Sequence, residues 1–238
     1  MKSLESKITF LLAVSIIFFA LCSLFQIKTA HTAALISDAP HIVVIDAGHG
    51  GEDGGAVSKS GVLESEINLA VAIKLEQLLA LCGIETHMIR QEDISLHTNG
   101  TTIRERKRSD LMQRLSIIEN TNNAILVSIH QNHFSESKYS GAQVFYSELE
   151  VSKQLASLTQ QCLRNTLDVS NNRKCKPAES VYIMKKITCP GILIECGFLS
   201  NPKEEILLQN EKYQTKISCA VGSALAQYIE KGESGIEV

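Results

Sequence analysis

Residues 41–51 read HIVVIDAGHGG, and this stretch decides the fold. An apolar run that ends in glycines is typical of a strand buried on both faces, at the centre of a parallel sheet. We therefore expect a strand over residues 41–46 with a tight glycine turn directly after it. The turn carries His49, and the chain that follows a central strand of such a sheet lies at its ligand-binding edge.

The rest of the chain alternates between apolar runs and segments with helical periodicity. Further strands are expected over residues 85–90, 124–130, 142–147, 181–185 and 192–195. Helices are expected over residues 66–82, 103–120, 151–167 and 212–230. Another helix begins at Asn201-Pro202, with Glu204 placed to close a capping box. This alternation predicts an α/β fold, a single-domain three-layer α/β/α arrangement around a mostly parallel, twisted sheet of about six strands.

The chain of 238 residues, 44% of them hydrophobic, suits one globular domain with an N-terminal appendage. We expect the domain over residues 41–231 and a flexible tail over 232–238. Residues 8–27 carry no charge and are long enough to span a bilayer as a helix. We favour a membrane anchor for segment 1–40, while Thr32-Ala33-Ala34 keeps a cleaved signal peptide open. Either alternative exports the domain and makes the protein extracytoplasmic.

Charge and composition exclude several classes of protein. A net charge of −3 does not suit a nucleic-acid binder. The absence of Trp argues against a glycan surface built on stacked indoles. The cysteines form no CxxC pair, which disfavours a cysteine-type zinc site. We expect mainly free thiols and regard Cys162 with Cys175 as the one pair to test for a disulfide.

Two histidines and two glutamates stand at the ends of apolar runs or loops: His49, Glu64, His130 and Glu195. Because the carboxyl ends of parallel strands share one edge of a sheet, we expect these side chains to converge. Two imidazoles and one carboxylate, with a second carboxylate nearby, form the ligand set of a catalytic zinc site with one open position. The pattern predicts a zinc hydrolase.

His49 and Glu195 each have a simpler interpretation as well. In that interpretation His49 is a turn or capping residue and binds no metal. Glu195, at the end of a buried run, either forms a salt bridge with a basic residue or acts as general base and acid beside zinc. His133 is a weaker ligand candidate, and Glu52 and Asp53 are expected to be exposed loop acids.

Three other features remain open at this point. Asp46 either supports the metal ligands or is simply a polar group at a strand end. Arg90 holds a loop or a substrate carboxylate. The basic run 104–108 is most often a solvated helix face, but it can also meet an anionic glycan or a membrane surface.

Four separated blocks resemble the zinc-dependent N-acetylmuramoyl-L-alanine amidases. They are DAGHGG (46–51), LE (63–64), SIHQN (128–132) and IECGFLSN (194–201), in the same order as in that family and within residues 41–231. The resemblance implies that His49, Glu64 and His130 bind zinc and that Glu195 is the catalytic glutamate. It also implies hydrolysis of the amide between the muramic acid lactyl group and L-alanine of peptidoglycan.

Three more stretches are similar to the germination-specific amidases of endospore-forming bacteria: residues 104–115, 140–146 and 181–185. This similarity implies action on spore cortex during sporulation and germination. It also implies a functional partnership with a muramic acid deacetylase towards muramic-δ-lactam. A lipoprotein activator stays open, and the only longer polar connection near the expected site is the loop 93–102.

Two alternatives share the same ligand set. A zinc carboxypeptidase acting on wall peptides would release single amino acids, whereas the amidase releases intact stem peptides. A non-catalytic wall-binding protein with a structural zinc would be expected to have four protein ligands. Product analysis separates the first alternative, and an assay with and without chelator separates the second.

Overall fold

The computed structural model describes residues 40–232. The expected anchor or signal segment and the expected tail beyond Gly232 lie outside these residues, so both stay predictions. None of the helices within residues 40–232 combines the length and apolar character that a membrane crossing requires.

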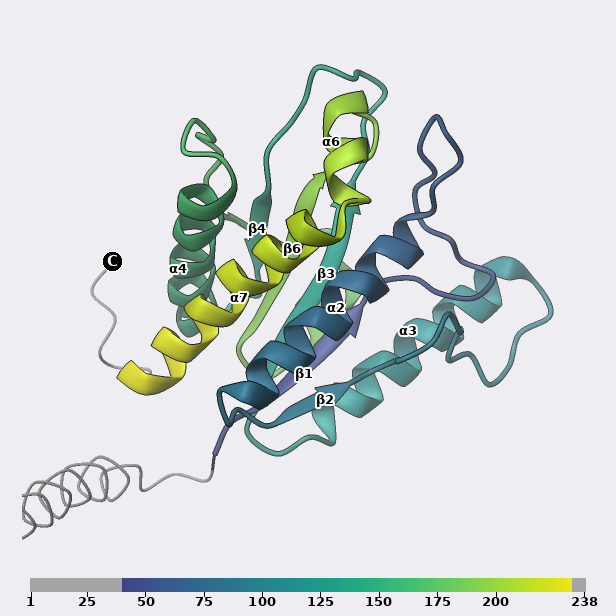
Figure 1. Cartoon of the computed structure of the whole chain (residues 1–238). Coiled ribbons are helices and arrows are strands. Elements are labelled where there is room, and N and C mark those ends of the chain that lie inside the picture. Colours follow the sequence, from purple (N-terminus) through teal and green to yellow (C-terminus); the bar gives the residue numbers. More distant parts are fainter. Residues whose placement is uncertain (1–39, 233–238) are drawn as a thin grey trace, which may run out of the picture. The chain divides into compact units, whose positions relative to one another are not determined.

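The domain is built on a six-stranded sheet in the order β2-β1-β3-β6-β4-β5 (Figure 1). In sequence order the strands are β1 (Ile42–Ala47), β2 (Thr86–Met88), β3 (Ala124–Asn132), β4 (Gln143–Tyr146), β5 (Lys176–Pro177) and β6 (Gly191–Phe198). Strands β2, β1, β3 and β6 run parallel, and β4 joins β6 in the antiparallel sense. The predicted α/β fold with a mostly parallel sheet is confirmed.

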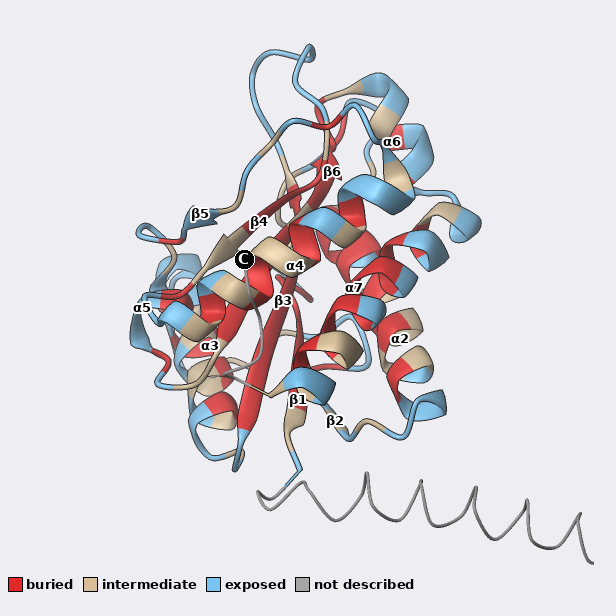
Figure 2. Cartoon of the chain, turned by 90° about the vertical axis from the view of Figure 1, so that its left-hand side faces the viewer, coloured by how far each residue is buried: buried red, intermediate tan, exposed pale blue. Residues whose placement is uncertain are grey.

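Helices cover both faces of this sheet, which gives the three expected layers (Figure 2). Three of them pack on one face: α2 (Glu64–Leu81), α4 (Glu150–Leu167) and α7 (Glu211–Lys231). Two pack on the other: α3 (Ile103–Glu119) and α5 (Tyr182–Lys186). Val43 and Ile45 point to the first layer and Val44 to the second. Burial on both faces explains why β1 is an unbroken apolar run.

One expected strand is a helix. The segment 181–185 forms α5, in which the neighbouring residues Ile183 and Met184 are both buried. Adjacent buried side chains fit one side of a helical turn, whereas a half-buried strand would alternate. The edge strand on the other side of β4 from β6 lies upstream instead, at β5, where Lys176 and Pro177 give no apolar strand pattern.

The helix after β6, α6 (Pro202–Leu208), begins as predicted but without a capping box. The Asn201 side chain accepts hydrogen bonds from the backbone N–H groups of Lys203 and Glu204. The Glu204 carboxylate does not return to Asn201. It accepts from the backbone N–H groups of Phe198 and Gly141, each at 2.8 Å, and so ties the β3–β4 loop to the end of β6.

Candidate active site

The four polar residues that end the apolar runs lie at one edge of the sheet. His49 directly follows β1, Glu64 is the first residue of α2, and His130 lies near the end of β3. Glu195 on β6 is the register partner of His130 on β3. Parallel strands that end together thus bring side chains from four segments into one place.

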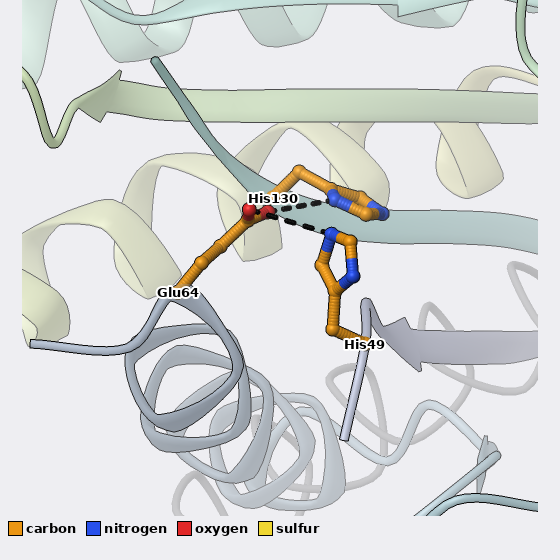
Figure 3. A group of neighbouring side chains, drawn as sticks. All are labelled: His49, Glu64 and His130. Atoms are coloured by element: carbon orange, nitrogen blue, oxygen red, sulfur yellow. Dashed lines mark hydrogen bonds and ion pairs between the residues drawn. The ribbon is translucent and has the colours of Figure 1, made fainter. Parts of the chain in front are cut away.

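The Glu64 carboxylate faces both imidazoles from one side (Figure 3). Its Oε1 is 2.9 Å from His130 Nδ1, and its Oε2 is 3.3 Å from His49 Nε2. One ligand atom from each of the three residues lies within 4.8 Å of the others, so this His–Glu–His group (His49, Glu64, His130) can hold a metal ion.

Backbone and side-chain donors hold the Glu64 carboxylate. The backbone N–H groups of Ala56 and Gln131 donate to it at 2.9 and 3.1 Å, and Asn68 Nδ2 donates at 3.3 Å. Burial alone would raise the pKa of Glu64, but hydrogen bonds and charge from His130 and His49 outweigh it and hold the pKa well below its usual range. Glu64 is therefore ionised, as a metal ligand must be.

Asp53 orients the His49 ring. Its Oδ2 is 2.9 Å from His49 Nδ1, which leaves Nε2 turned to Glu64. Burial lowers the pKa of His49, but the hydrogen bond with Asp53 and the contact with Glu64 raise it to about 9. A carboxylate on the second nitrogen of a histidine is the usual support of a metal ligand. The expectation that Asp53 is merely an exposed loop acid is wrong; its spacing of four residues from His49 was the available signal.

The glycine turn brings the backbone against the site. A Cβ on Gly48 would stand 2.2 Å from His130 Cε1, so only glycine fits there. His49 itself has φ of 62°, a left-handed conformation that is uncommon outside glycine. Such strain persists where surrounding contacts hold it in place.

Two buried arginines supply those contacts. Arg90 donates to the carbonyl oxygens of Ala47 (2.8 Å) and Gly48 (3.0 Å), so it holds the loop, one of its two expected roles. Arg114 donates to the carbonyl oxygen of His49 at 2.6 Å and to Asp46 Oδ1 at 2.6 Å. The sequence did not single out Arg114, because the site residues that it contacts, Asp46 and His49, lie more than 60 residues away.

Asp46 belongs to this support and does not face the metal group. It pairs with Arg114 and accepts a hydrogen bond from Ser128 Oγ at 2.7 Å. Burial acts to raise the pKa of Asp46, but the charges of Arg114 and His130 and the hydrogen bonds from Ser128 and Arg114 together lower it. A charged pair inside the sheet edge thus anchors the loop that carries His49.

Glu195 differs from the other acids of the site. Its Oε2 atom is buried and makes no hydrogen bond to any residue in the described range 40–232. Burial raises the pKa of Glu195 to about 7. The charge of His130 acts to lower this pKa, and the charge of Glu64 acts to raise it. The alternative of a salt bridge with a basic residue is not found among the described residues.

The remaining candidates lie apart from the metal group. His133 is exposed and outside the His–Glu–His group, and Glu52 pairs with Arg106 on α3. Cys162 and Cys175, the pair singled out for a test, are both free.

Residues 43–227 match the Amidase_3 family model, N-acetylmuramoyl-L-alanine amidase. The match covers most of the chain and includes all four site residues. The chain belongs to the N-acetylmuramoyl-L-alanine amidase family. The resemblance drawn from the four sequence blocks is confirmed, and the enzyme is an N-acetylmuramoyl-L-alanine amidase.

Relatives and solved structures agree with this assignment. The amidase is 38% identical over 195 residues to the germination-specific N-acetylmuramoyl-L-alanine amidase of Bacillus subtilis, covering 81% of each chain. The CwlD amidase of Clostridioides difficile, solved in complex with the GerS lipoprotein, is 40% identical with a TM-score of 0.78. That match covers 81% of the present chain and 100% of CwlD. An N-acetylmuramoyl-L-alanine amidase of Clostridium difficile 630 is 29% identical with a TM-score of 0.72, over 82% of this chain and 100% of that one.

Proposed function

We propose that this amidase hydrolyses the lactyl–L-alanine amide of spore-cortex peptidoglycan with a zinc ion held by His49, Glu64 and His130, and with Glu195 moving the proton. The observation that carries the proposal is the buried Oε2 of Glu195, which has no hydrogen-bond partner among the described residues, on the strand beside His130 of the His–Glu–His group. A carboxylate left without a partner in such a place needs a functional reason.

The donor set fits zinc better than other common metals. Imidazole nitrogens with one carboxylate oxygen suit Zn²⁺, whereas Ca²⁺ and Mg²⁺ prefer oxygen ligands alone. Three protein ligands leave one position open, as catalytic zinc sites do. The Asp53 contact to His49 Nδ1 adds the outer support that zinc-binding histidines usually have.

The chain's own groups account for the proton transfers. When bound, zinc lowers the pKa of a water molecule towards ~7 and polarises a carbonyl oxygen. Glu195 Oε2 accepts the proton of the attacking water, because it has no hydrogen bond to give up. The same oxygen then returns the proton to the nitrogen of the leaving L-alanine. Glu64 takes no part in proton transfer, because its carboxylate would bind the metal and also accepts hydrogen bonds from Ala56, Asn68 and Gln131.

Purified muropeptides test the bond that is cut and the metal together. We expect the enzyme to release intact stem peptides, to lose activity with a chelator, and to regain it with added zinc. Release of single amino acids would contradict the amidase assignment. Full activity in the chelated, metal-free protein would contradict the zinc proposal and leave the assignment of the bond intact.

The cortex role and the partners rest on the germination-specific relative and on CwlD. We propose that the amidase acts outside the cytoplasm, carried there by segment 1–40, that it works with a muramic acid deacetylase, and that a lipoprotein activates it. Expression in a Bacillus subtilis strain that lacks its germination-specific amidase should restore muramic-δ-lactam in the cortex. Normal amidase activity in vitro without this restoration would contradict the cortex role alone.

A further inference from the structure

A basic pocket lies between α3 and α5, next to the His49 loop. It has a volume of about 240 Å³ and is lined by Arg104, Lys107, Arg108, Leu111 and Tyr182. We infer that this α3–α5 pocket binds carboxylates of the stem peptide of the substrate. The inference deepens the proposed function, because it assigns substrate recognition to the same active site.

The pocket carries positive charge that the protein leaves uncompensated. Arg104 and Arg108 are exposed and form no ion pair or hydrogen bond within the described residues. Their neighbours are already engaged, since Arg106 pairs with Glu52 and Lys107 with Asp53. A guanidinium group matches a carboxylate with two parallel hydrogen bonds, so two free arginines side by side suit a ligand with carboxylates.

The lining also offers an apolar surface. Leu111 is partly buried against the core on the α3 side of the sheet, and the Tyr182 ring is 42% exposed. A ligand that joins carboxylates by aliphatic segments satisfies both parts of this lining. A stem peptide has this character, because it combines small apolar residues with free carboxyl groups.

A short chain of contacts connects the pocket to the metal group. Lys107 Nζ is 3.0 Å from Asp53 Oδ2, and the same oxygen is 2.9 Å from His49 Nδ1. The first turns of α3 therefore lie beside the β1–α2 loop (Figure 1).

The contacts favour the substrate over the other anions considered for the basic run 104–108. A membrane surface would favour cations spread over a flat face, whereas here Arg104, Lys107 and Arg108 gather at one pocket with an apolar interior that includes Leu111 and Tyr182. The direct link from Lys107 through Asp53 to His49 also places the pocket on the active-site side of α3.

Two soluble muropeptides with the same glycan test the inference, one with free stem carboxylates and one with these groups amidated. In the full chain loaded with zinc, the double variant Arg104→Gln/Arg108→Gln should raise KM for the first substrate roughly 3- to 10-fold with little change in kcat. KM for the amidated substrate should not change. The matched control Lys212→Gln/Lys216→Gln, on α7 across the sheet, removes the same charge and should change neither KM.

Binding to the Glu195→Gln variant by calorimetry gives a second readout that needs no turnover. There the two arginine substitutions should weaken binding of the free-carboxylate muropeptide by the same factor. The inference is overturned if the two arginine substitutions affect both muropeptides equally, or change neither KM nor affinity. It is also overturned if they weaken only the binding of the protein to anionic vesicles. Failure of the wild-type enzyme to cut either substrate would contradict the proposed function, and the binding result would still decide the role of the pocket.

Discussion

Two glutamates of the same site lie in opposite environments. They are Glu64, at the start of α2, and Glu195, on β6. Glu64 accepts hydrogen bonds from two backbone N–H groups and from Asn68, and a ring nitrogen of each imidazole lies within 3.3 Å of its oxygens. Glu195 has a buried Oε2 with no hydrogen-bond partner among the described residues. The pKa of Glu64 is held well below its usual range, whereas burial raises that of Glu195 to about 7.

The difference teaches that donors, not burial, decide the charge of an acid in this site. Burial acts to raise the pKa of both carboxyl groups. Only Glu64 has donors that outweigh it, so it stays an anion and suits a cation. Glu195 can gain and lose a proton near neutral pH, which is the property that a general base and acid needs. Substitutions on each side test this division of roles.

The largest effect is expected from Glu195→Gln. The amide cannot accept the proton of water, so kcat should fall by roughly 10²- to 10⁴-fold while zinc content stays that of the wild type. Turnover of muropeptides and metal analysis measure the two quantities. Glu204→Gln is the control, because Glu204 is also partly buried but contacts backbone N–H groups away from the metal group. Normal hydrolysis by Glu195→Gln would end the assignment.

The complementary substitution, Glu64→Gln, should act on the metal first. It replaces an anionic ligand with a neutral amide between two imidazoles, so zinc affinity should fall by more than about 100-fold. Titration against a zinc-selective chelator measures this affinity. His49→Ala should likewise reduce metal content, and full retention of zinc by either variant would refute the ligand role of the residue replaced.

The residues at strand ends were predictable because each followed a strong local pattern. His49, His130 and Glu195 end or follow apolar runs, and parallel strands that end together bring such positions to one edge. The roles of Asp46 and Arg90 were among the alternatives, but that of Arg114 was not predictable, since it meets His49 and Asp46 across more than 60 residues of chain. The segment 181–185 was mistaken for a strand because a short apolar run does not by itself distinguish the two structures.

A smaller effect is expected from Asp53→Ala, which removes the partner of His49 Nδ1. The His49 ring loses its fixed orientation, so zinc affinity should fall about 10- to 100-fold. Glu52→Ala is the matched control, because this neighbouring loop acid pairs with Arg106 and not with His49. If both variants bind zinc equally well, Asp53 has no part in orienting His49. The contrast between the Glu64 and Glu195 environments then rests on Glu64 alone.

The smallest effect, and the one that sharpens the comparison most, is expected from Asn201→Ala. Asn201 caps α6 just after β6 but donates nothing to Glu195. Loss of the cap should lower the free energy of unfolding by about 1 kcal/mol, as should Asn210→Ala at the start of α7. Neither variant should change kcat, because no hydrogen bond from the α6 cap holds Glu195 Oε2 in place. A fall in kcat for Asn201→Ala alone, measured beside denaturant unfolding, would mean that the α6 cap positions Glu195 after all.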